Sequence, residues 1–359
     1  MHISRECAFV PVSFFLGEKT VFLYDQWYLA AWDDEIDQQP VQRWLLDTPV
    51  VFYRKEAGQV VAMEDRCPHR LVPLSMGERV GDNIRCVYHG AVFNPEGKCE
   101  SLPGSTAQAR CNGVRTFPIE ERWGAIFIWM GEREKADAGL LPPAQLLRRE
   151  GRRTVRGVLP CKADYQLCVD NLLDLSHEAY LHPHTIGTLE VAEIPVETKV
   201  DANKVTVARL MKNVEAPKLF AEAKGIDANI DRYQTVTAYL PSFVTVDVKA
   251  TPVGEPDYDD PLEWQVLFFM TPERGDSTHY FFAVSRGFGL DSEPIDEALK
   301  AGALKTIHED IEMLEAQQAM LETIPLQDRT LYTRYDVAPD RARIIVDKMA
   351  SQEKEKEPT

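Results

Sequence analysis

Two short motifs, each combining one cysteine with one histidine, constrain the first third of the chain. They are Cys67-Pro-His69 and Cys86-Val-Tyr-His89, separated by the sixteen residues 70–85. Short apolar runs and Gly/Pro turns flank both motifs, so we expect each motif in the loop of a β-hairpin. Two such loops can bind a [2Fe–2S] cluster, with thiolates on one iron and imidazoles on the other. Imidazole ligation raises the reduction potential to roughly −150 to +300 mV.

Zinc is the competing metal for a set of two cysteines and two histidines. Zinc fingers usually place two cysteines in one half and two histidines in the other. In this chain each half mixes the two residue types. The mixed halves favour the iron–sulfur cluster, with Cys67, His69, Cys86 and His89 as its ligands.

A second segment, Asp170-Asn-Leu-Leu-Asp-Leu-Ser-His-Glu-Ala-Tyr-Leu-His182, places polar residues within an apolar stretch. The apolar residues predict a buried helix, where an unpaired neutral polar group costs roughly 1–3 kcal/mol. Two histidines and one carboxylate are the ligands of non-haem Fe(II) oxygenases. His177 and His182 diverge by about 140° on a continuous helix, so we expect the helix to end before Pro183 and His182 to turn back. Capping and core hydrogen bonds are the alternative explanation.

Composition narrows the class of protein. The chain has 359 residues, 44% of them apolar, which is enough for two domains. A formal net charge of −17 argues against nucleic acid or an anionic membrane as a partner, and no apolar run approaches the ~20 residues of a membrane span. Seven cysteines, an odd number, do not suit a disulfide framework. They indicate a reducing compartment, so we expect a cytoplasmic protein.

The order of the expected elements divides the chain. Residues 1–22 are interpreted as an N-terminal extension, 23–135 as an all-β domain of short strands, and 150–340 as a second domain. The highly charged residues 350–359 are predicted to be a disordered tail. In the second domain, strands are expected at 204–210, 235–239, 243–248, 264–269 and 278–284, a short helix and loop at 214–232, and a long helix at 297–324.

The two motifs resemble the Rieske loops of bacterial ring-hydroxylating and demethylating oxygenases. The matching stretches read Cys67-Pro-His-Arg and Cys86-Val-Tyr-His-Gly, and neither loop has the second cysteine found in respiratory Rieske proteins. The resemblance extends from Trp27 to about Ile324. It implies an α+β chain, with an N-terminal all-β Rieske domain and a helix-grip (START-like) catalytic domain. That second domain would combine a curved antiparallel sheet with a long C-terminal helix.

The resemblance also implies roles for the second segment. Its pattern Asn171-x2-Asp174-x2-His177-x4-His182 matches the mononuclear Fe(II) motif of these oxygenases. This implies His177 and His182 as iron ligands, and catalytic parts for Asn171 and Asp174. Asp174 would link His177 to a Rieske histidine, His89, of a neighbouring subunit. The family forms head-to-tail homotrimers, because the two centres of one subunit lie too far apart for fast electron transfer.

The third iron ligand is expected on the long helix at 297–324. On a helical wheel Asp310 lies at one edge of the apolar stripe and Glu315 at the other, whereas Glu309 and Glu312 project away from it. The resemblance over residues 309–317 favours Asp310. Glu315 stays the rival on geometry alone.

Three further side chains could border the substrate cavity, namely Trp264, His279 and Arg286. The simpler interpretation is a core position for Trp264, a cross-strand or surface position for His279, and a surface position for Arg286. Arg286 keeps some interest because an arginine can bind a substrate carboxylate through two hydrogen bonds.

Within the family the chain resembles vanillate O-demethylases and related aryl-ether monooxygenases. The implied reaction uses O2, two electrons and two protons to convert an aromatic methoxy acid into a phenol and formaldehyde. The chain has no complete Gly-x-Gly-x-x-Gly motif, since Gly287-Phe-Gly289 lacks the third glycine, so a separate flavin- or ferredoxin-type reductase is implied. The alternatives are ring hydroxylation or dihydroxylation, oxidation of an N-methyl or aryl methyl group, a Rieske electron-transfer protein, and a zinc-binding scaffold.

Overall fold

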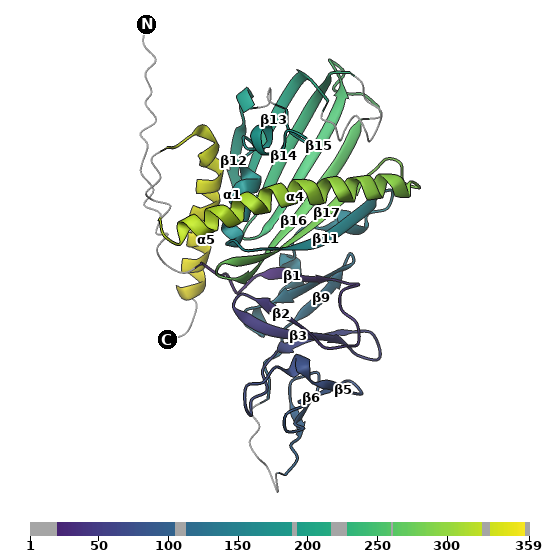
Figure 1. The fold of residues 1–359 in the computed structure, drawn as a ribbon, viewed down its shortest axis with the longest axis vertical. Helices are drawn as coiled ribbons and strands as arrows, with labels where there is room; N and C mark the ends of the chain where they lie inside the picture. Colours follow the sequence, from purple (N-terminus) through teal and green to yellow (C-terminus); the bar gives the residue numbers. More distant parts are fainter. Residues whose placement is uncertain are drawn as a thin grey trace.

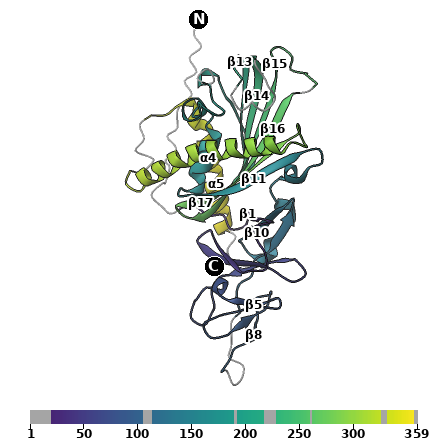
Figure 2. The same ribbon diagram turned by 45° about the vertical axis from the view of Figure 1, so that its right-hand side comes forward.

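The computed structural model describes residues 20–104, 113–188, 192–216, 228–259, 261–324 and 331–355. A small β domain lies at one end of the molecule, and a larger domain of sheet and helices lies at the other (Figure 1). The view in Figure 2 shows the long helix α4 crossing one face of the large sheet. The order of the two domains is therefore the one that the sequence predicted.

The N-terminal domain consists of three small antiparallel sheets. One contains β1, β10 and β9, another β2, β3 and β4, and the third β5 to β8. Their bounds are Trp27–Trp32 (β1), Val41–Leu45 (β2), Thr48–Arg54 (β3), Val60–Glu64 (β4), Glu78–Val80 (β5), Asn83–Arg85 (β6), Val92–Phe93 (β7), Cys99–Ser101 (β8), Ile119–Arg122 (β9) and Ala125–Trp129 (β10). Both cysteine–histidine motifs lie in loops next to the sheet of β5 to β8, at the far end of the molecule from α1 (Figure 1).

The second domain contains one antiparallel sheet of seven strands in the order β11-β17-β16-β15-β14-β13-β12. The strands are Arg153–Cys161 (β11), Glu197–Asp201 (β12), Lys204–Val214 (β13), Ile230–Tyr239 (β14), Phe243–Pro252 (β15), Leu262–Arg274 (β16) and Ser277–Arg286 (β17). All five predicted strands are present and longer than expected. The sequence interpretation missed β11 and β12 at the two edges.

Among the described residues, four helices pack on this sheet: α1 (Tyr165–Leu173), α2 (Glu178–Leu181), α4 (Glu293–Leu321) and α5 (Val337–Glu355). The apolar faces of α1, α4 and α5 share one core with the sheet, to which α4 contributes Ile307, Ile311 and Leu314. Helix α1 lies against β14 and β16 and also contacts α4, which crosses the sheet beside it (Figure 1), and this places the polar segment after α1 against the long helix.

The two domains share an apolar core. Its side chains come from Trp27, Leu29, Trp32, Phe127 and Trp129 on the N-terminal side and Phe243, Leu267, Phe269 and Phe281 on the sheet side. Burial of apolar surface stabilises by roughly 25 cal/mol per Å², so aromatic residues of this size hold the domains together firmly. Hydrogen bonds across the boundary, such as Thr271 Oγ1 to Leu29 O (2.8 Å), fix their relative orientation.

One expectation about the chain ends needs correction. Residues 350–355 are not a disordered tail but the last turns of α5, because Ala342, Val346 and Ala350 form an apolar stripe that packs against α1; residues 356–359 lie outside the described residues. Most of the predicted N-terminal extension, residues 1–19, also lies outside them. Its last residues contact the second domain, where Thr20 donates a hydrogen bond to Asp164 (2.9 Å).

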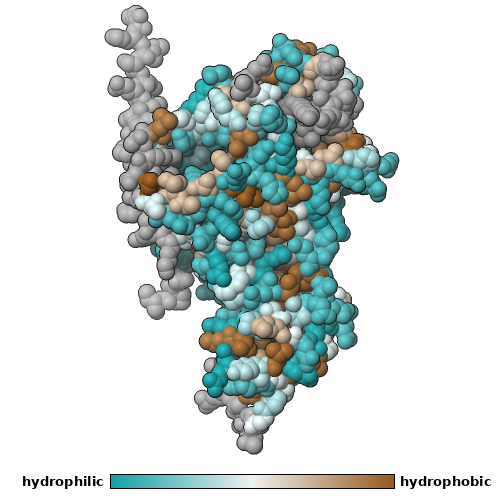
Figure 3. All heavy atoms as spheres, viewed as in Figure 1, coloured by the Kyte–Doolittle hydropathy of each residue, from teal (hydrophilic) through white to brown (hydrophobic). Residues whose placement is uncertain are grey.

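The expected short helix and loop at 214–232 is wrong at its ends, where Val214 completes β13 and residues 230–232 begin β14; residues 217–227 lie outside the described residues. Among the described residues, no helix combines the length and hydropathy that a membrane crossing requires. The face drawn in Figure 3 is largely hydrophilic, with apolar patches over the N-terminal domain.

Candidate metal centres

The two cysteine–histidine loops repeat one backbone design. In the first, Cys67 N donates to Val72 O and Cys67 O accepts from Leu71 N, both at 2.9 Å, and the second loop repeats both bonds around Cys86 at 2.8 and 2.9 Å. The residue four positions after each cysteine has a positive φ, 60° at Leu71 and 74° at Gly90. The chain therefore turns sharply in each loop, and the histidine lies between the cysteine and the residue with the positive φ.

The sulfurs lie inside and the imidazoles outside. Cys67 and Cys86 are 1% and 2% exposed, whereas His69 and His89 are exposed, with ring centroids 4.3 Å apart. Burial raises the pKa of the Cys67 thiol, as does the adjacent Cys86 sulfur, while the N–H groups of His69 and Arg70 donate to the Cys67 sulfur and oppose that rise. Two adjacent sulfurs below two adjacent imidazoles fit a [2Fe–2S] cluster with one iron of each kind.

The second site begins where α1 ends. Instead of one helix running to His182, α1 stops at Leu173, and a short α2 begins at Glu178, with His177 as its N-cap. The Asp174 carboxylate causes this break, because it accepts hydrogen bonds from Ser176 N (2.8 Å) and Ser176 Oγ (2.5 Å) and so stabilises a turn. The chain therefore redirects before His177, and not only at Pro183 as the sequence suggested.

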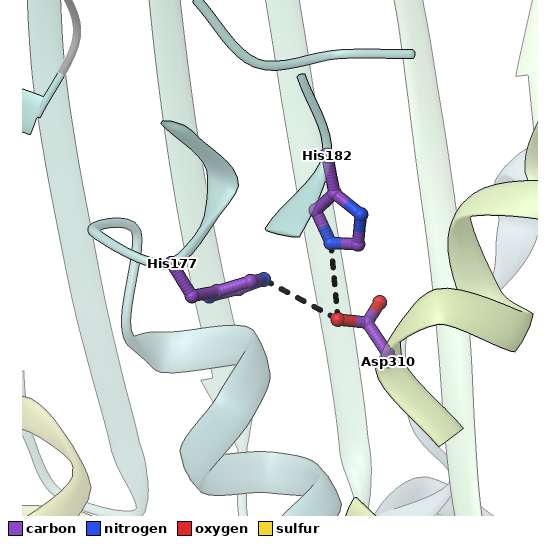
Figure 4. Close-up of side chains that lie close together, drawn as sticks. All are labelled: His177, His182 and Asp310. Atoms are coloured by element: carbon purple, nitrogen blue, oxygen red, sulfur yellow. Dashed lines mark hydrogen bonds and ion pairs between the residues drawn. The ribbon is translucent and has the colours of Figure 1, made fainter. Parts of the chain in front are cut away.

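This break brings three side chains together (Figure 4). The ligand atoms of His177, His182 and Asp310 lie within 4.8 Å of one another. Asp310 Oδ1 is 3.4 Å from His177 Nε2 and 3.0 Å from His182 Nε2. His182 and Asp310 are buried and His177 is nearly so, so the set is a two-histidine, one-carboxylate arrangement in a largely buried position.

Hydrogen bonds on the far side of each imidazole fix its orientation. His177 Nδ1 donates to the main-chain oxygen of Asp174, and His182 Nδ1 donates to Glu309 Oε2 at 2.8 Å. Both partners accept only, so both histidines carry a proton on Nδ1. Each Nε2 faces the Asp310 carboxylate, to which it donates a hydrogen bond. Loss of the Nε2 protons would leave both lone pairs directed at the same place, as metal binding through Nε2 requires.

The charges of the three groups reinforce one another. Burial would raise the pKa of Asp310, but the hydrogen bonds and charges of the two histidines lower it to about 2. Burial would lower the pKa of His177, but Asp310 outweighs it and raises that pKa to about 8. Asn171 Nδ2 also donates to Asp310 (3.1 Å), while its buried Oδ1 accepts no hydrogen bond from the described residues. The two imidazoles and one carboxylate, with this unused acceptor beside them, fit Fe(II).

Other predictions about this region have mixed outcomes. Glu309 does not project away from the site, because α4 lies close enough for its carboxylate to reach His182. Glu315 points elsewhere and accepts from Lys162 N (3.0 Å). The Asp174 carboxylate contacts Ser176 and not His177. Asp174 instead orients His177 through its main-chain oxygen.

The three candidate cavity residues are also placed. Trp264 is a core residue, as expected. His279 lies at the domain boundary, with Nε2 2.9 Å from Trp44 O. The surface prediction for Arg286 is wrong: it is 1% exposed and forms an ion pair with Asp296 at 2.7 Å. This pairing uses the guanidinium that a substrate carboxylate would need.

Comparison with known proteins agrees with both centres. The model of the Rieske [2Fe–2S] domain matches residues 26–118, and that of the vanillate O-demethylase oxygenase C-terminal domain matches residues 161–352. A vanillate O-demethylase oxygenase subunit of Pseudomonas sp. (strain HR199 / DSM 7063) is 35% identical, over 93% of this chain and 97% of its own length. The chain belongs to the vanillate O-demethylase family of Rieske oxygenases. It is thus an oxidoreductase, the oxygenase component of a multi-component system, which implies a separate reductase.

Other members of this family of Rieske oxygenases are similarly related. The iron–sulfur subunit of a toluene-4-sulfonate monooxygenase system of Comamonas testosteroni is 32% identical, over 93% of this chain and 98% of its own. A crystal structure of dicamba monooxygenase bound to 3,6-dichlorosalicylic acid superimposes with a TM-score of 0.87 at 30% identity, over 93% of this chain and 99% of that one. Members of this family use a Rieske cluster together with a mononuclear iron, for which this chain offers a matching residue set at each site.

Proposed function

We propose that this protein is the oxygenase component of an aryl O-demethylase that acts on a vanillate-like methoxy acid and releases formaldehyde. The observation that carries the proposal is the convergence of His177, His182 and Asp310 in a buried site on a chain that also has paired cysteine–histidine loops. The mononuclear iron supplies O2 activation when bound, and the cluster supplies electrons to it. The names of the similar proteins, a vanillate and a dicamba demethylase among them, support a methoxy aromatic substrate.

The residues have distinct roles in this proposal. Cys67, His69, Cys86 and His89 hold the cluster, and His177, His182 and Asp310 hold the iron. Asn171 keeps the Asp310 carboxylate turned towards the histidines through its 3.1 Å hydrogen bond. Beside α2, Met211, Leu262 and Trp264 share one buried apolar cluster with Ala179, and surroundings of this kind suit an aromatic ring more than a sugar or nucleotide.

The buried arginines favour neutral groups as partners of the substrate acid. Arg209, Arg286 and Arg343 each form an ion pair with a carboxylate of the protein, Glu178, Asp296 and Asp170 respectively. We therefore expect amide, hydroxyl or imidazole groups to bind the substrate carboxylate.

We further propose that the protein works as a head-to-tail homotrimer in the cytoplasm. The cysteine–histidine loops lie at one end of the molecule, and α1 lies in the larger domain beyond the sheets of β1 to β4 (Figure 1), so we expect a neighbouring subunit's loops to be the electron source. Asp174, half-buried at the end of α1, would join His177 to His89 of the partner subunit. Among the described residues, Cys67, Cys86, Cys161 and Cys168 form no disulfide, in keeping with a reducing compartment.

A single-turnover measurement tests the reaction. The protein is reduced chemically in the absence of a reductase and mixed with a panel of methoxybenzoates, toluene sulfonate and an N-methyl aromatic. After exposure to O2, each sample is assayed for formaldehyde and hydroxylated products. Formaldehyde in proportion to the reduced cluster, from a methoxybenzoate, is the expected result. A hydroxymethyl product from toluene sulfonate, or a hydroxylated ring, would replace demethylation with that other oxidation.

The role of Asp174 has its own test. Asp174→Asn should keep both metal centres but reduce steady-state turnover by about 100-fold or more, because the carboxylate couples two subunits. Metal analysis and the visible spectrum check the centres, and oxygen consumption checks turnover. Turnover at the wild-type rate would show that electrons do not need this residue.

A further inference from the structure

A buried polar network lies beneath the segment that carries both histidines. Glu178 on α2, Arg209 on β13 and Gln234 on β14 are 4%, 5% and 2% exposed. Both strands alternate buried and less buried residues, and Arg209 and Gln234 occupy inward positions among apolar neighbours. Charged and amide groups at such positions are costly unless they are fully bonded.

These three side chains satisfy one another closely. Arg209 Nη2 donates to Glu178 Oε2 and Gln234 Nε2 donates to Glu178 Oε1, both at 2.6 Å. Gln234 Oε1 accepts from Arg209 Nε (3.1 Å) and Nη2 (2.8 Å). Both carboxylate oxygens are therefore bonded to groups of the sheet, which fixes the position of Glu178 on it.

The network also binds the main chain on the other side of His177. Arg209 Nη1 donates to Leu175 O at 2.9 Å, and Leu175 lies two positions before His177. The side chain of Glu178 directly follows that histidine. One arginine thus anchors the chain just before and just after His177.

A second arginine acts near the other histidine. Arg232 Nη1 donates to Ile186 O at 2.9 Å, and its Nη2 is 3.8 Å from Glu178 Oε2. Gly187 N donates to His182 O (3.0 Å), and this hydrogen bond closes the turn over residues 182–187. The main chain is therefore tied to the sheet at both ends of the segment 175–186.

Stability alone is a weak reason for such a network. A buried ion pair is often no more stabilising than apolar side chains of the same volume, and apolar residues would suit these inward positions. A helix as short as the four residues of α2 also has little stability of its own. What the network supplies that apolar residues would not is a fixed location for the main chain at Leu175 and Glu178.

We propose that Glu178, Arg209 and Gln234 are positioning residues that hold His177 in its metal-binding position before the metal arrives. The inference rests on the proposed function, in which His177, His182 and Asp310 bind Fe(II). Pre-set ligands bind a metal more tightly, because no free energy is spent on ordering them. Loss of the network should therefore weaken metal binding more than it weakens the fold.

The test uses a double variant, Glu178→Gln with Arg209→Met. The new amide at position 178 can exchange two hydrogen bonds with Gln234, and the methionine fills much of the space of the arginine, so the fold should be kept. The anchor on Leu175 O is lost. Fe(II) affinity is measured anaerobically by competition with a chromophoric chelator, the Co(II) absorption spectrum reports ligand geometry, and the unfolding midpoint reports stability.

We expect the Fe(II) dissociation constant to rise about 10- to 100-fold, the range for loss of groups that orient metal ligands, with a changed Co(II) spectrum and a near-normal midpoint. The matched control is Asp296→Asn with Arg286→Met, which removes the ion pair between β17 and the first turn of α4, away from the histidines, and should leave Fe(II) affinity unchanged. Arg209→Lys keeps the charge but replaces three donor nitrogens with one, and should show a smaller change in the same direction.

Three results would each overturn one of the two proposals, the positioning role or the iron site. Wild-type Fe(II) affinity in the Glu178/Arg209 double variant would overturn the positioning role. Equal losses in this variant and in the Asp296/Arg286 control would also overturn it, since both would then reflect general loosening. If His182→Ala binds Fe(II) as tightly as the wild type, the iron site of the proposed function fails instead, and this result is independent of the other two.

Discussion

The two candidate metal centres are built in opposite ways. The cysteine–histidine loops are local: all four ligands lie between residues 67 and 89, two similar turns shape them, and both imidazoles reach the surface. The iron site joins segments more than 120 residues apart, from His182 to Asp310, and rests on buried ion pairs. An exposed centre suits electron exchange with other proteins, whereas a buried one keeps water and stray reductants from the reactive metal.

The largest expected effects separate the two centres. Cys67→Ser should remove the cluster's visible absorption and leave Fe(II) binding at the other site, whereas His182→Ala should do the reverse. Each should reduce turnover by about 100-fold or more, because both centres are needed. Metal analysis with visible spectroscopy is the check. Loss of both centres in either variant would mean that the sites depend on each other for folding.

The second prediction concerns the buried ion pair between Arg343 on α5 and Asp170 on α1 (2.5 Å). This pair holds in place the helix that leads to the histidines of the iron site. Arg343→Ala leaves a buried carboxylate without its cation, which typically costs about 3–5 kcal/mol. The exposed pair of Arg85 with Glu78 serves as the control, since Arg85→Ala should cost less than about 1 kcal/mol. Urea unfolding at pH 7 measures both. If both substitutions lowered the free energy of unfolding equally, the buried ion pair would support the iron site no more than an exposed pair supports the cluster loops.

The same pair gives a pH dependence. Burial, opposed by Arg343, raises the pKa of Asp170 to about 6 from its ordinary value of 3.8. The folded state then binds this proton more tightly than the unfolded state, so the contribution of Asp170 to stability falls as the pH rises from about 4 to about 6. In Arg343→Met the carboxyl should hold its proton to higher pH still, so the deficit of the variant should grow above pH 6. Unfolding free energies of both proteins between pH 5 and 8 check this, and a deficit that stays flat would contradict it.

The smallest effect is expected at the partly exposed edge of the iron site. Glu309, 24% exposed at its side chain, accepts the Nδ1 proton of His182. Glu309→Gln keeps an oxygen acceptor and removes the charge, so Fe(II) affinity should fall by less than the roughly 10- to 100-fold that is typical when such a group is lost. Chelator competition measures the change. A loss as large as that of His182→Ala would make Glu309 a ligand and not a support.

The sequence predicted the local centre from its own spacing, because the two motifs carry all four ligands within hairpin loops. The strands of the large sheet were also predictable from alternation, although their ends were not, since pairing with neighbours extends them. For the iron site, the sequence alone offered Asp310 and Glu315 equally. The resemblance pointed to Asp310, and the structure brings Asp310, not Glu315, to the histidines.

The remaining errors have physical causes. Ser176 caps the end of α1 through Asp174, and that break could not be read from apolar spacing. Glu309 was placed by a helical wheel, which shows directions around one helix but not what lies beside it. Arg209 and Gln234 did leave a signal, as polar residues at inward positions of alternating strands. The surface prediction for Arg286 failed because an arginine can be buried when a carboxylate pairs with it. Only the folded structure shows that Asp296 is that partner.

The packing of α5 on α1 has a consequence for the order in which the two sites can form during synthesis. Because synthesis runs from the N-terminus, Asp310 follows His182 by 128 residues, and Arg343 follows later still. The histidines of the iron site therefore emerge without their carboxylate partner and without the ion pair of Arg343 with Asp170. The four ligands of the cluster need no such distant segment, since all of them lie between residues 67 and 89.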